Sequence, residues 1–174
     1  MHSILRNVLY LFASLALVFC LVSPATAGTD ALCSGNNATV ECLKNNCEQL
    51  YSENYDLFWD IIYKSEKKAY SSGTVSDVRD YLELASIKDF NSVEFDEYLS
   101  EAMPKLFIMW PEMFLDALSI SNEETVNGFV YLLQTPLGDN ETEITALMKK
   151  YGKDSKYKII MDKYFANNSD NISE

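Results

Sequence analysis

Histidine is nearly absent from this sequence. The single one, His2, lies in an N-terminal segment that we expect to be removed on export. Catalysis by Ser-His-Asp or Cys-His groups, hydrolysis at an HExxH zinc site and pH switching by histidine all require an imidazole. The mature chain lacks that group, so we expect a protein that is not an enzyme, with no catalytic residues and no cofactor.

Basic residues are also scarce. The chain of 174 residues has 14 Lys and Arg against 26 Asp and Glu, a formal net charge of −12. Removal of the N-terminal segment takes away Arg6 and no acid, which makes the mature chain more negative still. Because contacts to nucleic-acid phosphates depend on clustered Lys and Arg, we do not expect nucleic acid as a partner.

Alternating apolar and polar stretches, the mark of a half-buried strand, are missing. Apolar residues recur instead at spacings of three and four, first over some thirty residues from Val40 onward. Thr39 is placed to cap this first helix, and the residues 71–73 (Ser-Ser-Gly) end it. The pattern predicts an all-α fold, a compact bundle or a stack of helical hairpins with six to eight helices.

Several residues mark the ends of the later helices. Asn91 with Glu94 has the spacing of a capping box, and Ser121 with Glu124 is a full S-x-x-E box. Proline lacks the backbone donor, so Pro104 closes one helix or opens the next, and Pro111 breaks the helix that reaches it. These signals predict helices at about 76–87, from 92 onward, after 121, at 141–151 and at 155–166.

Apolar runs long enough to span a bilayer are missing too. The longest, Val8 to Val22, is shorter than the roughly 20 residues that a spanning helix needs. It follows Arg6 and precedes Pro24 and an A-x-A cleavage site at 25–27. We therefore predict a cleavable signal peptide at 1–27, a single helical domain at 28–166 and a disordered tail at 167–174. The mature protein is expected to be secreted or periplasmic, without a stable membrane span.

Three cysteines, Cys33, Cys42 and Cys47, remain after signal cleavage and lie within fifteen positions. A structural zinc site wants four Cys or His ligands, and no histidine is available to complete this set, so we predict no metal site. A C-x-x-C redox motif is absent as well. In an oxidising compartment the expected product is a disulfide.

Helix geometry restricts the pairing of these cysteines. If one helix covers both Cys42 and Cys47, their Cα atoms lie about 8.6 Å apart, whereas a disulfide needs them within about 7 Å. Cys33 is then one partner. Cys47 falls on the apolar face of the helix, so we predict a Cys33–Cys42 staple with Cys47 free and buried, and Cys33–Cys47 as the alternative.

Acidic residues are concentrated in the middle of the chain. From Asp77 to Glu124 twelve acids face three basic residues, while lysines gather near the C-terminus. In the helix that starts near 92, an apolar face through Val93, Tyr98 and Leu99 turns most acids toward water. Such a surface can steer a cationic partner toward itself.

We expect an exported binding protein, for example an inhibitor or immunity-type partner of a cationic extracytoplasmic enzyme. The expected contact residues, which would meet a basic surface on another exported protein, are Asp96, Glu97 and Glu101.

An alternative function rests on the most apolar part of the mature chain. Phe107, Trp110 and Phe114 could line a pocket for an apolar small molecule or lipid, although such spacing is also typical of a helical core.

The sequence further contains four N-x-[ST] motifs, which we expect to be glycosylated if the source is eukaryotic. Their asparagines are Asn37, Asn140, Asn167 and Asn171.

Overall fold

The computed structural model describes residues 32–87 and 90–168, with the backbone alone at 72, 167 and 168. The predicted signal peptide lies outside these ranges, as do residues 169–174 of the predicted tail. The described residues from Cys33 onward belong to one compact unit. None of the described helices is long and apolar enough to cross a membrane.

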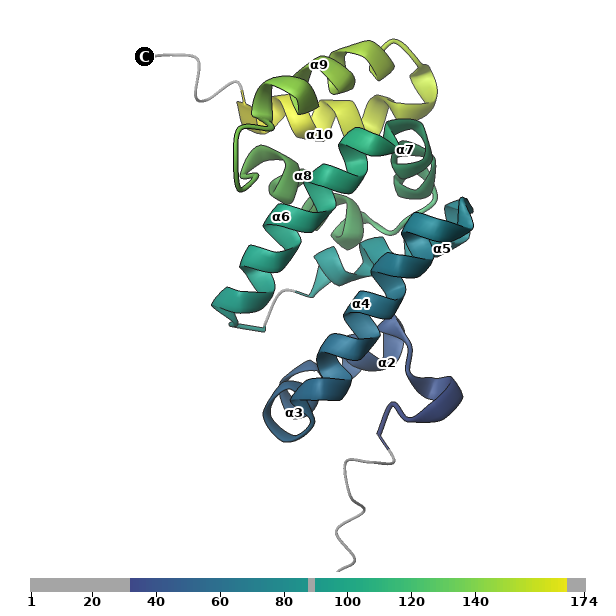
Figure 1. Cartoon of the computed structure of the whole chain (residues 1–174). Coiled ribbons are helices and arrows are strands. Elements are labelled where there is room, and N and C mark those ends of the chain that lie inside the picture. The colour runs from purple at the N-terminus through teal and green to yellow at the C-terminus, as the bar shows by residue number, and fades with distance from the viewer. Residues whose placement is uncertain (1–31, 88–89, 169–174) are drawn as a thin grey trace, which may run out of the picture. The chain divides into compact units, whose positions relative to one another are not determined.

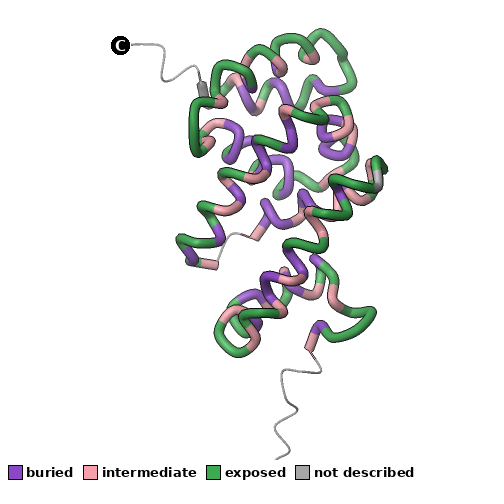
Figure 2. Tube along the Cα trace, in the orientation of Figure 1, coloured by how far each residue is buried: buried purple, intermediate pink, exposed green. Residues whose placement is uncertain are grey.

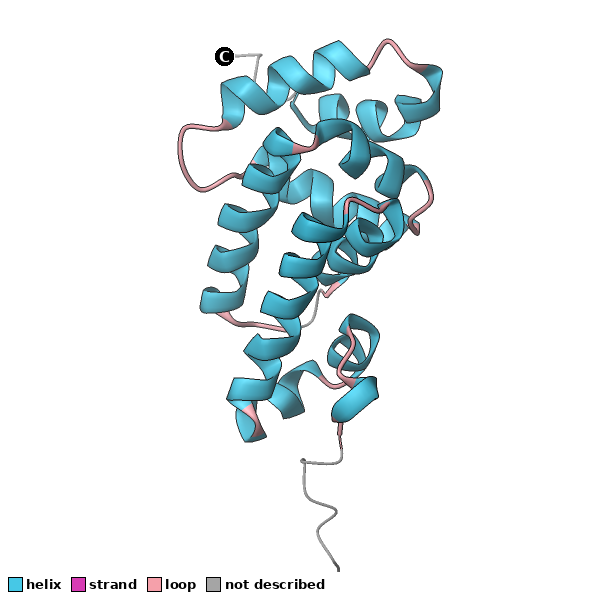
Figure 3. Ribbon diagram, turned by 45° about the vertical axis from the view of Figure 1, so that its right-hand side comes forward, coloured by secondary structure: helices cyan, strands magenta, loops and turns pink. Residues whose placement is uncertain are grey.

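The described residues form an all-α fold, as the sequence predicts. They contain nine α-helices and three short 3-10 helices, joined by short loops and without a strand (Figure 3). Helices α2 and α3 lie at one end of the unit and α9 and α10 at the other (Figure 1). The helices are η2 (Gly35–Asn37), α2 (Val40–Asn45), α3 (Cys47–Glu53), α4 (Tyr55–Ser72), α5 (Val75–Leu82), η3 (Glu83–Ser86), α6 (Val93–Met109), α7 (Pro111–Ser119), α8 (Glu123–Gln134), α9 (Glu141–Tyr151), η4 (Ser155–Tyr157) and α10 (Lys158–Asn168).

The first predicted helix is divided into three, which raises the number of helices above the expected range. The breaks occur at Asn46 and Asn54, whose φ angles of −136° and −145° leave the helical region. The Asn46 side chain donates a hydrogen bond to the Cys42 carbonyl at 2.8 Å, and the Asn54 side chain accepts one from the Leu57 amide at 3.3 Å. Asparagine competes in this way with the helical hydrogen bonds of the backbone. The prediction of one continuous helix was therefore wrong.

The N-terminal staple joins Cys33 to Cys42, as predicted, with the two Cα atoms 5.6 Å apart. Cys33 is 2% exposed and has a φ of +54°, a left-handed conformation that is unusual for any residue except glycine. Thr39 caps α2 by accepting a hydrogen bond from the Cys42 amide at 3.2 Å. The disulfide and the cap together fix the segment that precedes α2 against the start of that helix.

Helix α6 does not end at Pro104 but continues for five residues beyond it, to Met109. Proline has no N–H to donate, so the carbonyl of Ser100 loses its partner within the helix. The amide of Leu137, in the loop after α8, donates to this carbonyl at 3.2 Å instead. A contact outside the helix thus satisfies the group that Pro104 leaves open. Pro111 occupies the first position of α7, where its missing donor has no consequence.

Two helix caps are shifted by one residue from the predicted positions. Ser92, rather than Asn91, caps α6 by accepting from the Phe95 amide at 3.3 Å. Asn122, rather than Ser121, caps α8 by accepting from the Thr125 amide at 2.9 Å. Each capping residue has an extended backbone, as the geometry of a cap requires.

The core runs from the inner faces of α2 and α3 along α4 to α8 and reaches α9 and α10 (Figure 2). Phe107, Phe114 and Phe129 are fully buried there, with ring centroids 5.7 to 6.5 Å apart. Helix α8 approaches η3 very closely at Gly128, where a Cβ atom would lie 1.8 Å from the carbonyl oxygen of Ala85. This close approach sets the distance between α8 and η3.

Candidate functional site

The three acids predicted to contact a partner are all exposed on α6. Glu101 forms an ion pair with Lys105 at 2.5 Å, one helical turn further on. Neither Asp96 nor Glu97 has an ion pair among the described residues. At 100° per residue, Asp96 points to one side of the helix, and Glu97 and Glu101 lie together on its outer face.

The buried face of α6 differs from the predicted one. Val93 is 74% exposed, whereas Phe95, Leu99 and Met103 are buried. Tyr98 is only half-buried. The face of α6 that packs on the core is therefore displaced from the one predicted, because the spacing of three and four begins at Phe95 rather than at Val93. As a result, Asp96 lies next to the core face, beside Leu99.

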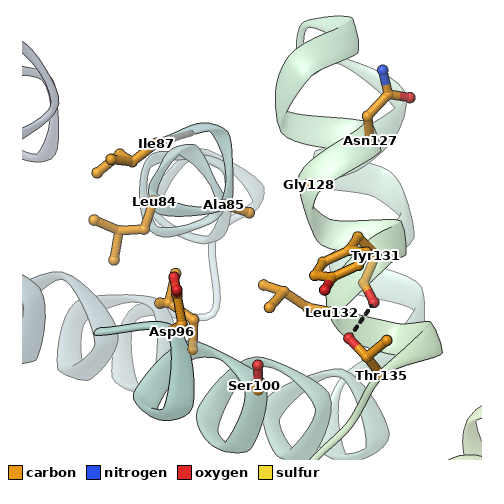
Figure 4. A pocket seen from close by; sticks show the side chains of 11 residues that line it. Leu84, Ala85, Ile87, Asp96, Ser100, Asn127, Gly128, Tyr131, Leu132 and Thr135 are labelled. Atoms are coloured by element: carbon orange, nitrogen blue, oxygen red, sulfur yellow. Dashed lines mark hydrogen bonds between the residues drawn. The ribbon is translucent and has the colours of Figure 1, made fainter. Parts of the chain in front are cut away.

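A cleft of about 560 Å³ opens beside Asp96. Residues from three elements that are distant in the sequence border it, and Figure 4 shows the Asp96 carboxylate directed from α6 toward η3, with Tyr131 of α8 on the opposite side. The floor is mainly apolar, and the polar groups stand at its edges. The lining residues are Leu84, Ala85 and Ile87 around η3, Asp96, Leu99 and Ser100 of α6, and Asn127, Gly128, Tyr131, Leu132 and Thr135 of α8 and its C-terminal end.

The α8 side of the cleft presents an exposed aromatic ring. Tyr131 is 63% exposed, and its carbonyl accepts a hydrogen bond from the Thr135 hydroxyl at 2.9 Å (Figure 4). The face of a tyrosine ring attracts cations. The cleft thus combines one carboxylate, one aromatic ring and an apolar floor, a set of groups that suits a ligand with a positive charge at the end of an apolar chain.

Burial raises the pKa of the Asp96 carboxyl above its ordinary value. The cause is partial removal of the carboxylate from water, which disfavours its charged form. A bound cation would reverse this effect, because an opposite charge nearby favours the carboxylate. Asp96 is therefore an acid whose charge is poorly compensated by the protein itself.

Other acids in the middle of the chain are neutralised by the C-terminal lysines. Asp116 pairs with Lys156 at 2.5 Å and also accepts a hydrogen bond from Tyr157, and both contacts lower the pKa of its carboxyl. Glu123 pairs with Lys163 at 2.9 Å. The separation of charge along the sequence is thus partly cancelled in space. Three neighbouring acids without an ion pair among the described residues, Glu94, Asp96 and Glu97, lie on the N-terminal half of α6.

The residues of the alternative pocket lie in different environments. Phe107 and Phe114 are in the core, whereas Trp110 is 47% exposed. A groove of about 460 Å³ does lie beside Trp110, but Phe107 and Phe114 do not line it. It is bordered by Gly73, Val75, Met109, Trp110, Pro111, Glu112, Met113, Asp116 and Tyr151, a mixture of apolar and charged residues.

The glycosylation motifs occupy different environments. Asn37 is exposed in η2, and Asn140 is half-buried immediately before α9. The side chain of Asn167 and the whole of Asn171 lie outside the described residues. Modification at these four positions stays a prediction.

Cys47 is a free thiol and is buried, with 7% of its surface exposed. Burial, with a smaller contribution from Glu48, raises its pKa to about 12. Only the thiolate reacts with alkylating agents. We expect the native protein at pH 8 to resist labelling by iodoacetamide and the protein unfolded in guanidinium chloride to be labelled rapidly, as followed by mass spectrometry. Equal labelling rates in the two states would contradict the buried position.

Most of the cleft was not predicted from the sequence. Asp96 was predicted as a contact residue. The cleft residues of η3 and α8 lie far from Asp96 in the sequence, and no local pattern connects them with Asp96. One signal was available: Gly128 lies inside an otherwise apolar and regular helical pattern. A glycine in such a position indicates a close approach of another backbone, and the structure shows that approach at Ala85.

Comparisons with family models, with curated proteins and with solved structures found no match to this chain.

Proposed function

We propose that this protein is an exported, non-enzymatic binding protein that engages a cationic protein partner through α6, with the cleft beside Asp96 receiving a basic side chain of that partner. The observation that carries the proposal is the position of Asp96. It is an acid without an ion pair among the described residues, at the edge of a cleft whose floor is apolar and whose far side presents Tyr131. A lysine or arginine side chain has the complementary form, an apolar stem that ends in a charge.

The proposal of export rests on the N-terminal segment together with the disulfide. The sequence of residues 1–27 has the features of a secretory signal, and the Cys33–Cys42 bond suits an oxidising compartment. An inhibitor or immunity-type role follows from the same features, because a small acidic protein exported with a cationic enzyme can cover a basic surface on it.

Substitution of Asp96 by Asn tests this function. The partner would be captured from the extracytoplasmic compartment and its affinity measured by calorimetry. We expect Asp96→Asn to weaken binding about thirtyfold or more, since loss of one member of a close charge pair at an interface typically costs about 2 kcal/mol or more. The matched control is a double variant that removes two exposed acids of α9, Glu141→Gln with Glu143→Gln. It should change the affinity less than threefold.

Stability and pH dependence give independent readouts of the same site. Because the pKa of Asp96 is raised in the folded protein, its ionisation opposes folding as pH rises, and Asp96→Asn should leave the free energy of unfolding at pH 7 unchanged or raise it. A bound cation lowers that pKa, so affinity should increase as pH rises through the pKa of Asp96 and then level off. Unchanged affinity in Asp96→Asn, or binding that is insensitive to salt, would refute the proposal.

A further inference from the structure

Five aromatic side chains form a connected row beside α6, here called the aromatic ladder: Tyr51, Tyr55, Trp59, Tyr63 and Tyr98. Tyr55, Trp59 and Tyr63 follow one another at intervals of four residues along α4, which places them on one side of that helix, and Tyr51 at the end of α3 contacts Tyr55. Tyr98 of α6 contacts both Trp59 and Tyr63. Neighbouring ring centroids in the row lie between 5.4 and 6.2 Å apart.

Two rings of the ladder lie at the surface. Tyr55 is 43% exposed and Tyr63 is 51% exposed, whereas Trp59 between them is buried and Tyr51 and Tyr98 are half-buried. Beneath the ladder, Phe58 and Phe95 are fully buried, and these close the core at this point. Exposed tyrosines next to a tryptophan are typical of residues that dominate binding energy at protein interfaces.

Carboxylates border the ladder and make it attractive to cations. Glu94 accepts hydrogen bonds from the hydroxyls of Tyr51 at 3.3 Å and Tyr55 at 2.7 Å. Glu66 accepts one from the Tyr98 hydroxyl at 2.8 Å. In the described part of the chain, lysines contact rings at Tyr151 and Tyr157, and none contacts the ladder. No lysine of the described residues therefore occupies the exposed side of the Tyr55 and Tyr63 rings.

The ladder and the Asp96 cleft lie on two sides of the same helix. At 100° per residue, Glu94 and Tyr98 point toward α4, Asp96 points toward the cleft, and Glu97 and Glu101 occupy the face between them. An interface of ordinary size buries about 800 Å² on each partner, enough to cover both sides of one helix. A single partner can therefore reach across α6.

We propose that the aromatic ladder is the second half of the partner interface and that it selects arginine rather than lysine. This inference rests on the proposed function, since it assumes the same basic partner. The planar guanidinium of arginine stacks on aromatic rings and pairs with a carboxylate in two parallel hydrogen bonds, whereas the lysine ammonium does neither as well. The Tyr55 ring with Glu94 beside it supplies both contacts, and the exposed Tyr63 ring supplies a second site for stacking.

Two peptides of equal charge test the selection. Hexa-arginine and hexa-lysine would be titrated into the full mature protein and their dissociation constants measured by calorimetry at low salt. We expect hexa-arginine to bind about tenfold more tightly, as two exposed cation–π contacts would give. Tyr55→Leu with Tyr63→Leu should abolish this preference. Tyr55→Phe with Tyr63→Phe, which keeps both rings, should retain it.

The possible results separate the ladder from the Asp96 cleft. Equal affinities for the two peptides, or a preference that survives in the Leu pair, would overturn the role of the ladder and leave the cleft untouched. Affinities unaffected by Asp96→Asn for both peptides would instead refute the proposed function. A dimer that sediments as such and dissociates in the Leu pair would also overturn the inference, because a second copy of the chain would then cover the ladder.

Discussion

The Gly128→Ala variant is expected to lose about 3 kcal/mol or more of its free energy of unfolding. In an exposed helix the same change would stabilise the protein by about 1 kcal/mol, because alanine is the better helix former. Here the new Cβ atom would lie 1.8 Å from the carbonyl oxygen of Ala85, and a backbone atom cannot move aside as a flexible side chain can. The steric cost should therefore reverse the sign of the effect.

Thermal and urea unfolding would measure this loss. A decrease of 3 kcal/mol corresponds to a fall in melting temperature of roughly 6 to 12 °C for a domain of this size. Asn127→Ala is the matched control, since it makes the same alanine on the preceding, exposed residue of α8. It removes only an exposed hydrogen bond from Lys163 and should cost less than about 1 kcal/mol. A Gly128→Ala variant as stable as the wild type would mean that α8 and η3 are not in close contact.

Removal of the staple should have the second-largest effect. The Cys33–Cys42 bond closes a loop with a sequence separation of 9, and the chain-entropy relation gives about 2.5 kcal/mol for a loop of this length. The backbone at Cys33 makes a separate, unfavourable contribution to stability, because its φ of +54° disfavours every residue except glycine. Cysteine and alanine both bear this cost. Cys33→Ala with Cys42→Ala should therefore lose the disulfide and keep the unfavourable conformation.

Glycine separates these two contributions. Cys33→Gly with Cys42→Ala removes the same bond but suits the left-handed backbone, so it should be more stable than the double-alanine variant by about 1 kcal/mol. Reduction of the wild type by dithiothreitol should lower its urea midpoint toward that of the variants. If the reduced and oxidised proteins unfolded at the same urea concentration, the staple would contribute nothing to stability.

The class of fold could be predicted from the sequence because apolar periodicity reflects burial, and burial decides which face of each helix points inward. Leu43, Cys47 and Leu50 are buried as that period requires. The breaks that divide the first predicted helix into α2, α3 and α4 could not be predicted in the same way. Asn46 and Asn54 interrupt the helix through their own hydrogen bonds and leave the apolar spacing intact, so a reading based on spacing passes over them.

The disulfide shows how a correct prediction can follow from a wrong premise. It was derived from a continuous helix through Cys42 and Cys47, and the structure breaks that helix between the two residues. The pairing still holds because the choice between Cys42 and Cys47 depended mainly on burial. Cys47 lies on the apolar face and stays in the core, which left Cys42 for the bond.

The candidate site was predictable only in part, for a related reason. Exposure of Asp96 follows from the pattern of its own helix, whereas the cleft beside it depends on η3 and α8, which reach α6 through tertiary packing. The charge distribution has the same limit. Pairing of Lys156 with Asp116 and of Lys163 with Glu123 joins segments some forty residues apart and neutralises two acids of the long acidic region.

The hydrogen bond from the Leu137 amide to the Ser100 carbonyl has a consequence for the order of folding. It closes a loop that contains the end of α6 and all of α7 and α8, and contacts that close long loops form late because chain entropy opposes them. Thr135 and Ser100, at the edge of the cleft, lie close to this bond in the sequence. We therefore expect the cleft to take shape after the helices around it have docked, as one of the last events of folding.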